Sequence, residues 1–352
     1  MGKAAAGLAG AIIAGGEVVE TIKSGIIDPA DITDPRIFIW VMMGALLGGA
    51  IWLNLATWLR APVSTTHSIV GGVMGAGISA AGWAVVNWPV MGAIVSSWII
   101  SPLAGALIAA GLVYLLERKV LWKADPLAAA GRFVPWLLAL MAWTFTTYLA
   151  LKGLSNVVSI PAPVAMGAGV VAGAVTLFAT RPRIARRAPS LTSDREGVNQ
   201  LFTMPLIFAA ALLSFAHGAN DVANAIGPLA GIYEVLAGGD GAEEVGIPLW
   251  ILIVGALGIS VGLALFGPRL IRTVGSEITE LDRSRAFCVG LSAALTVIVA
   301  SQLGLPVSST HVALGGIFGV GFLREYLQQR MSQAIQKVLR SHEGDEHLAE
   351  VE

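Results

Sequence analysis

The chain has 352 residues, of which 55% are hydrophobic and only 13% charged, and its 22 Lys and Arg nearly balance its 23 Asp and Glu. This composition excludes an ordinary soluble domain, in which about 25% of residues are charged, and a disordered chain, which contains far less apolar material. It provides no basic surplus for nucleic acid, and the single cysteine, Cys288, excludes an intrachain disulfide. We therefore expect an all-α polytopic membrane protein.

The first apolar run covers residues 4–16 and is short for a membrane span. A signal peptide can also begin this way, but Lys3 is the only basic residue and residues 14–17 make a poor cleavage site. We expect a membrane helix there, complete or shortened. Seven later segments are apolar enough to cross a bilayer, which takes about 20 residues. They are 37–59, 90–116, 133–151, 162–179, 203–215, 248–266 and 286–303.

Residues 62–82 and 306–322 are also apolar, but each begins with a polar run and then becomes rich in glycine. Helices that face lipid along their whole length rarely have this pattern, whereas broken or re-entrant helices buried in protein do. From residue 323 onwards, apolar residues form one stripe of an otherwise polar helix. We expect this last segment to be a polar tail outside the bilayer.

Basic residues in two short connections set the expected orientation. One connection carries Arg118, Lys119 and Lys123, and the other carries four arginines between residues 181 and 187. Two predicted spans separate the connections, so both can face the cytoplasm. The expected location is therefore a membrane crossed several times, with the bacterial inner or plasma membrane as the first choice.

Two segments of the chain repeat each other. Residues 62–77, PVSTTHSIVGGVMGAG, and residues 306–321, PVSSTHVALGGIFGVG, are identical at nine of 16 positions. The spans that precede them are predicted to cross in opposite directions, so the copies are inverted. Inverted repeats with interrupted helices are the architecture of secondary transporters. We expect an inverted-repeat bundle with a first half at 1–130, connecting spans at 131–200, a second half at 201–322 and a tail at 323–352.

The segment with the most polar chemistry is residues 214–229, SFAHGANDVANAIGPL. Asp221, with Asn220 and Asn224, puts a carboxylate and two amides within about one helical turn. A charged Asp at the bilayer centre costs about 2.5–3.5 kcal/mol, so it usually faces a partner or a wet cavity. Its oxygens suit Na⁺ or a proton, and the amide N–H₂ groups can hold an anion beside that cation. His217 precedes the motif and is expected to be structural.

Each repeated Pro-Val-Ser element is expected to start a helix, because proline favours the first helical turn. The hydroxyl groups that follow stand beside free N-terminal amides, which bind an oxyanion without needing Lys or Arg. The candidate oxyanion ligands are Ser64, Thr65, Thr66, Ser308, Ser309 and Thr310. For any single hydroxyl, a bond to its own backbone is an equal alternative. His67 and His311 are expected either to contact the ligand or to support the site.

At these residues the sequence closely resembles the inorganic phosphate transporter family, the PiT-type sodium– or proton–phosphate symporters. The matching pieces are GANDVANAIGPL at 218–229, PVSTTH at 62–67, PVSSTH at 306–311, GGEVVETI at 15–22 and RLIRTVGSEIT at 269–279. The resemblance implies a symporter that imports phosphate with Na⁺ or H⁺ and needs no other cofactor. Asn220, Asn224 and the six hydroxyl residues would bind phosphate, and Asp221 with Asn224 would bind the coupling ion, with Na⁺ as a candidate at Asp221.

The family has a GAND-type element in each half and closes with a full span. By the repeat offset the first such element would precede Met1, and the second Pro-Val-Ser element is followed only by the polar tail. We therefore expect the chain to be shorter than the family pattern at both ends. Because of this shorter length, a non-transporting scaffold or an inactive fragment is kept as an alternative. The expected partners are phosphate, a monovalent cation and the lipid bilayer, without nucleic acid, and a homo-oligomer is compatible with the sequence.

Two further functions stay open. A sulfate permease fits the same motifs, because sulfate is also a tetrahedral oxyanion. A membrane-embedded serine hydrolase would use Ser308, His311 and Asp221 as a triad. The hydrolase is the weaker reading, because Ser308 and His311 lie three residues apart on one short element and the Ser-His motif occurs twice in inverted positions, which catalysis does not require. We expect a protein that is not an enzyme.

Overall fold

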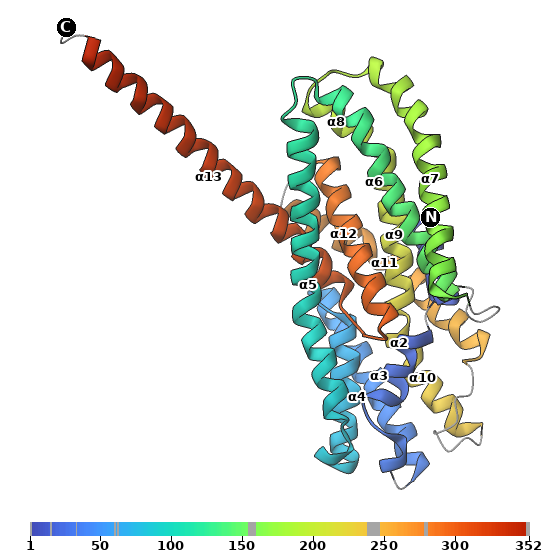
Figure 1. Cartoon of the computed structure of the whole chain (residues 1–352). Coiled ribbons are helices and arrows are strands. Elements are labelled where there is room, and N and C mark those ends of the chain that lie inside the picture. The colour runs from blue at the N-terminus through green and yellow to red at the C-terminus, as the bar shows by residue number, and fades with distance from the viewer. Residues whose placement is uncertain are drawn as a thin grey trace.

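The computed structural model describes the backbone of residues 2–14, 16–32, 34–59, 61, 63–153, 160–237, 247–277 and 281–349. Within these residues every regular element is a helix, and the β pairing is limited to one isolated bridge between Ile27 and Val86. The helices form an elongated bundle from which the last helix projects (Figure 1). The predicted all-α fold is confirmed.

Among the described residues, seven helical segments are long and apolar enough to cross a bilayer, as predicted. They are α3 (Pro35–Trp58), α5 (Trp88–Leu116) with η4 (Glu117–Leu121), α6 (Pro126–Tyr148) with η5 (Leu149–Gly153), α7 (Ala162–Arg187), α9 (Thr203–Asp221) with α10 (Ala223–Leu236), α11 (Leu249–Glu277) and α12 (Arg283–Gln302). The predicted span at 203–215 is too short, because α9 continues through the polar GAND residues and α10 follows almost directly.

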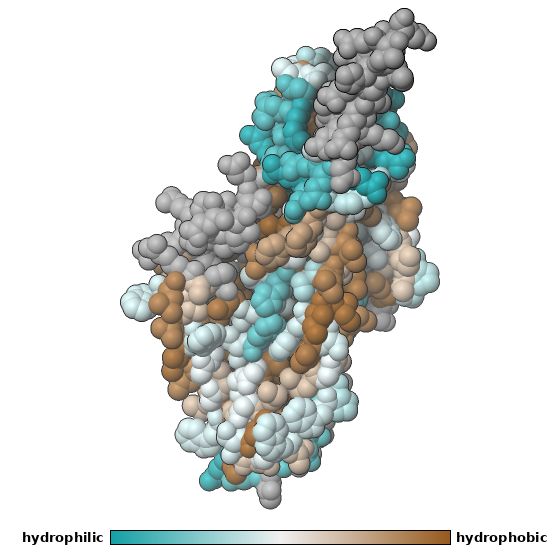
Figure 2. Space-filling model, turned by 90° about the vertical axis from the view of Figure 1, so that its left-hand side faces the viewer, coloured by the Kyte–Doolittle hydropathy of each residue, from teal (hydrophilic) through white to brown (hydrophobic). Residues whose placement is uncertain are grey.

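Large apolar side chains cover the outside of the bundle. Trp40, Leu47, Leu107 and Phe178 are among those exposed, and brown hydrophobic surface covers much of the middle of the face in Figure 2. Hydrophilic surface gathers toward the upper end of the same face (Figure 2). An extended apolar exterior of this kind is stable in lipid and unfavourable in water. Together with the seven spans, it identifies a multi-pass membrane protein.

The first apolar run forms α1 (Gly2–Ala14), which is followed by α2 (Gly16–Glu20) and the π-helical turn η1 (Thr21–Gly25). Helix α1 packs against α9 so closely that a Cβ atom on Gly218 would collide with the backbone of Gly7. Small residues allow this approach between membrane helices. Residues 4–14 of the predicted run are therefore part of a helix of the bundle, and residue 15 lies outside the described residues.

The two predicted broken helices are α4 (Thr65–Ala81) and α13 (Ser309–Ala349). Their N-termini meet near the middle of the bundle, and the helices run from there in opposite directions (Figure 1). Each begins with a serine cap: Ser64 Oγ accepts from His67 N at 3.1 Å, and Ser308 Oγ accepts from His311 N at 3.2 Å. The repeated sequence thus forms repeated local structure in opposite orientation.

The two copies differ in how they end. Helix α4 ends at Gly82, whose φ of 81° lies in the left-handed region that favours glycine, and the chain then turns through η3 (Trp83–Val85) into α5. Helix α13 continues without a break to Ala349, so the polar tail expected from residue 323 is the outer part of the same helix. At residue 323 the amino-acid composition changes, but the helical backbone continues.

The basic connections lie together at one end of the bundle, the upper end in Figure 1. Ser193, which precedes α8 (Arg195–Leu201), donates a hydrogen bond to Asp125 Oδ1 at the start of α6. Arg195 Nη2 lies 3.2 Å from Glu117 Oε1, and its Nε lies 3.3 Å from Asp282 Oδ2. The connection that leads into α3 and contains η2 (Pro29–Asp31) lies toward the other end of the bundle (Figure 1).

Asp282 caps α12 at the basic end, and we expect its contribution to stability to depend on pH. Burial raises the pKa of this carboxyl, but hydrogen bonds from Arg285 N and Ser284 Oγ, with the charges of Arg285 and Arg195, bring it below its usual value. A depressed pKa in the folded state means that the contribution is complete above the unfolded pKa and is lost as pH falls through the folded pKa.

We therefore predict that Asp282→Ala lowers the free energy of unfolding by about 1 kcal/mol at pH 7 and that this effect becomes progressively smaller as pH falls below 3.8. The measurement is the Tm of the purified protein and the variant across this pH range. A difference in Tm that stays constant as pH falls would contradict the assignment.

Candidate functional site

The site begins at the break between α9 and α10, which is centred on Val222. Asn220, Asp221 and Asn224 are all buried there, although they are strongly polar. Val222 itself keeps helical dihedral angles, with φ of −59° and ψ of −33°, and Pro228 farther along α10 leaves the carbonyl of Asn224 without its usual helical donor. The polar groups of the GAND motif therefore lie at a helix interruption inside the bundle.

Asp221 contacts two side chains through one of its oxygens. Its Oδ2 accepts a hydrogen bond from Ser309 Oγ at 3.0 Å and lies 2.8 Å from His217 Nδ1. The same His217 nitrogen is 2.7 Å from Ser309 Oγ, so the three groups form a closed triangle. The other carboxylate oxygen, Oδ1, is buried and has no hydrogen-bond partner among the described residues. Asp221 thus connects the α9–α10 break to the N-terminus of α13.

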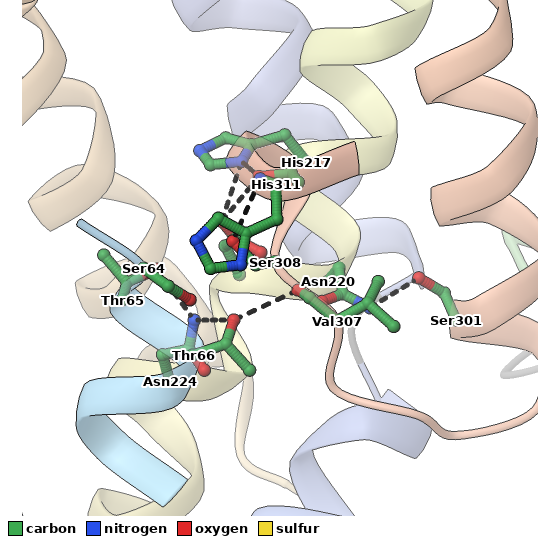
Figure 3. A network of polar contacts seen from close by, with 12 residues as sticks. Ser64, Thr65, Thr66, His217, Asn220, Asn224, Ser301, Val307, Ser308 and His311 are labelled. Carbon is green, nitrogen blue, oxygen red and sulfur yellow. Dashed lines mark hydrogen bonds and ion pairs between the residues drawn. The ribbon is translucent and has the colours of Figure 1, made fainter. Parts of the chain in front are cut away.

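The two asparagines reach in different directions (Figure 3). Asn220 Nδ2 donates to Ser301 Oγ at 2.9 Å and to the carbonyl of Leu305 at 3.2 Å. Asn224 Nδ2 donates to the hydroxyls of Thr65 and Thr66, at 3.2 Å each, at the N-terminus of α4. The break therefore contacts both inverted elements, α4 through Asn224 and α13 through Asp221.

Three side-chain oxygens at the break have no hydrogen-bond partner in the described part of the chain. They are Oδ1 of Asn220, of Asp221 and of Asn224, and all three are buried. An unsatisfied buried acceptor costs about 1–3 kcal/mol, so such oxygens are usually matched by a cation or by water. A set of one carboxylate and two amide oxygens fits the preference of Na⁺ for oxygen ligands. No group of three His, Cys, Asp or Glu residues suited to a transition metal occurs in the described part of the chain.

The two helix N-termini are joined directly to each other. Thr66 Oγ1 donates to the carbonyl of Val307 at 3.1 Å, which ties α4 to the segment before α13 (Figure 3). The His67 and His311 rings lie 4.8 Å apart between their centroids, and His67 also lies 3.8 Å from the Trp98 ring. Trp98 Nε1 in turn donates to the carbonyl of Pro306 at 2.9 Å.

An open cavity of about 350 Å³ lies beside these N-termini. It is lined by Trp52, Val63, Ser64, His67, Ser68 and His311. The first-turn N–H groups of an α-helix have no acceptor within the helix, and they carry its positive partial charge. Hydroxyls and free amides from two opposed helices therefore converge next to a space that a small anion can enter.

The structure brings together most of the residues predicted for the site. Asn224 contacts Thr65 and Thr66, Asp221 contacts Ser309, and Asn220 contacts Ser301, so three neighbouring groups of contacts start from the α9–α10 break. Ser64 and Ser308 cap the two helices, and His67 and His311 line the cavity. Thr310 is half-buried and makes no side-chain hydrogen bond among the described residues. The repeat is therefore not symmetric in its contacts.

Sequence reasoning missed two side chains of the network, His217 and Ser301. His217 was expected to be structural, yet it contacts Asp221 directly. The spacing of four residues between His217 and Asp221 could have indicated this contact, because residues four apart lie on the same face of a helix. Ser301 supports Asn220 from α12, and no local pattern points to it, because it lies 81 positions away.

Thr66 and Thr310 occupy equivalent positions of the repeat, but only Thr66 forms side-chain hydrogen bonds among the described residues, so matched substitutions can test the effect of these bonds. Thr66→Val removes the donor to Val307 O and the acceptor for Asn224 Nδ2, so we expect a loss of about 1–3 kcal/mol in the free energy of unfolding. Thr310→Val makes the same chemical change at the equivalent repeat position, and we expect little loss. The measurement is the Tm of both variants; equal losses would contradict this bonding.

The chain is similar to known proteins over nearly its whole length. The sequence profile described as the phosphate transporter family matches residues 3–341. A relative named "Putative phosphate permease" in Helicobacter pylori strain 26695 is 51% identical over 97% of this chain and 66% of its own length. A relative of the same description in Pyrococcus furiosus is 41% identical over 90% of this chain and 76% of its own length. The chain spans just under two thirds of the length of the Helicobacter relatives.

One solved structure is also similar. It is described as "The sodium-dependent phosphate transporter", with a TM-score of 0.86 and 35% sequence identity. The match covers 92% of this chain and 80% of the other. The relatives and the solved structure are thus described as transport proteins.

Proposed function

The chain belongs to the phosphate transporter family, and on that premise we propose that it moves inorganic phosphate across a membrane together with a monovalent cation. The observation that carries this proposal is the convergence of two opposed helix N-termini on a helix break with three unpartnered oxygens. An anion and a cation can be held side by side there, which is the physical requirement for symport.

Phosphate is the proposed anion. The expected ligands are the first-turn hydroxyls and amides of α4 and α13, Ser64 to Thr66 and Ser308 to Thr310, with the amide groups of Asn220 and Asn224. Such helix termini favour an oxyanion through partial charges and hydrogen bonds, without a buried Lys or Arg. Asn224 supports this assignment because its amide already bonds the Thr65 and Thr66 hydroxyls.

Na⁺ is the proposed coupling ion, and H⁺ is the alternative. The oxygen donors Asn220 Oδ1, Asp221 Oδ1 and Asn224 Oδ1 would coordinate Na⁺ without displacing any described hydrogen bond. The similar solved structure is described as sodium-dependent, which favours Na⁺ over H⁺. Cation binding at Asp221 would also offset the charge of the phosphate next to it.

A hydrolase built on Ser308, His311 and Asp221 has less support. Ser308 Oγ is engaged with the backbone N–H of His311 as a helix cap, and Asp221 contacts Ser309 and His217 instead. We therefore propose a transporter that is not an enzyme. It would work in a bacterial inner membrane with the basic end in the cytoplasm, with residues 1–130 and 201–322 as its two inverted halves.

The test of this function is uptake of radiolabelled phosphate into liposomes that contain the purified protein. We expect uptake that depends on an inward Na⁺ gradient and that excess sulfate does not reduce. Uptake driven equally by a pH gradient without Na⁺ would assign H⁺ as the coupling ion. Sulfate uptake without phosphate uptake would contradict the proposal, and no uptake of either would favour a scaffold or an inactive fragment.

A further inference from the structure

A second polar pocket lies far from the transport site, at the basic end of the bundle. It has a volume of about 890 Å³ and is lined mainly by the C-terminal part of α5, by η4 and by α13. Figure 1 shows that α13 departs from the bundle beside α5. The walls of the pocket come from α5, η4, α8, α12, α13 and the start of α6. The lining residues are Val113, Glu117, Leu121, Trp122, Pro126, Arg195, Arg285, Leu323, Arg324, Leu327, Gln328 and Arg330.

The pocket carries a clear positive charge. Four of its lining residues are arginines, and Glu117 is the one acid among them. Arg195 already has partners in Glu117 and Asp282, at 3.2 and 3.3 Å. Arg324 and Arg330 on α13 form no ion pair with any described residue, and the Arg330 guanidinium lies over the Tyr326 ring. An anion in the pocket would therefore interact with arginine side chains whose positive charge no described carboxylate neutralises.

Arg285 supplies the deepest of these charges and is incompletely bonded. Only 13% of its side chain is exposed, and its Nε is fully buried without a hydrogen-bond partner among the described residues. The nearest carboxylate oxygens, on Glu117 and Asp282, are 3.7 and 3.8 Å from its terminal nitrogens, too far for good hydrogen bonds. A buried guanidinium of this kind is stabilised by an oxyanion that accepts its N–H groups.

Most of the remaining lining of the pocket is apolar, and this favours one kind of anion over another. Val113, Leu121, Trp122, Leu323 and Leu327 form a hydrophobic wall beside the arginines. Contact with apolar side chains does not stabilise a free inorganic anion. A phospholipid, in contrast, has acyl chains that can pack against them as well as a phosphate group. The exposed indole of Trp122 is typical of the boundary between bilayer and water.

We propose that this pocket binds an anionic phospholipid, with the phosphate on Arg285 and Arg324 and an acyl chain along the apolar wall. Basic pockets between membrane helices bind such headgroups. Because α13 forms one side of the pocket, the bound lipid would hold its outer part against α5 and α12. The proposal does not depend on the transported substrate.

The test uses native mass spectrometry of the full chain, purified with equal amounts of phosphatidylglycerol and phosphatidylcholine. The double variant Arg324→Gln/Arg330→Gln removes two exposed arginines of the pocket. The matched control is Arg283→Gln, which removes an exposed arginine at the same end that does not line the pocket. We expect the ratio of bound phosphatidylglycerol to phosphatidylcholine to fall by about tenfold in the double variant and to be unchanged in the control.

Three outcomes would overturn the proposal: an unchanged ratio in the double variant, an equal fall in the control, or displacement of the lipid from the wild type by millimolar inorganic phosphate. The last result would assign the pocket to the free anion. Arg285→Gln provides a second reading, since it removes the deepest charge. If that variant folds, as judged by its Tm, we expect it to lose the preference for phosphatidylglycerol as well.

Discussion

Asp221→Asn is expected to abolish phosphate uptake while leaving the protein folded. The variant keeps the size of the side chain but removes the negative charge that faces the proposed cation. A charged ligand of this kind contributes about 3 kcal/mol, which corresponds to about 100-fold weaker cation binding. Uptake is proposed to need the cation, so we expect the initial rate of phosphate uptake into proteoliposomes to fall by about 100-fold as well. The measurement uses a Na⁺ concentration that only partly saturates the wild type.

The control for this prediction is Asp194→Asn, which changes an exposed carboxylate far from the site. Asp194 caps α8 by accepting from Gly197 N at 2.8 Å, and asparagine preserves a cap. We expect uptake close to that of the wild type. If Asp221→Asn retained most of its Na⁺-dependent uptake, the coupling ion would not bind at this carboxylate.

Gly315→Ala is expected to lower the stability of the protein considerably, although it adds only one methyl group. A Cβ at Gly315 would collide with the backbone of Pro102 on α5, so α5 and α13 would have to separate. Overpacking of this kind typically costs about 1–3 kcal/mol, and the collision is with backbone that no side-chain rotation can relieve. We expect a lower Tm in detergent and a smaller monodisperse fraction on gel filtration.

Gly321→Ala is the matched control on the same helix. No atom lies within 4 Å of a Cβ built at Gly321, and alanine is the better helix former. We expect its Tm to be equal to or slightly above that of the wild type. A similar loss in both variants would mean that helix packing against α5 is not the cause.

Much of the fold could be predicted from the sequence, because the bilayer imposes simple rules. Apolar length predicted the seven spans, and the Pro-Val-Ser repeat predicted the two inverted helix starts at Thr65 and Ser309. Helix ends were harder where polar residues continue a buried helix. Residues 214–221 are part of α9 because their polar groups find partners on other helices, which local hydropathy cannot indicate.

Contacts between distant segments account for the rest. The role of Ser301 and the tie between Thr66 and Val307 follow from how α9, α12 and the two inverted elements pack together. The arginine pocket also arises only in three dimensions, because Arg195, Arg285 and Arg324 come from three helices. Sequence showed that these residues are charged and near span ends, but not that they share one pocket.

The central claim is that an oxyanion binds between the N-termini of α4 and α13, next to Asp221. The most direct test is a crystal structure of the protein grown with Na⁺ and arsenate, a tetrahedral analogue of phosphate whose arsenic atom scatters anomalously. The account predicts an anomalous peak within hydrogen-bond reach of the hydroxyls of Thr65 and Ser309. A peak confined to another place, such as the arginine pocket at Arg285, or the absence of any peak at saturating arsenate, would contradict it.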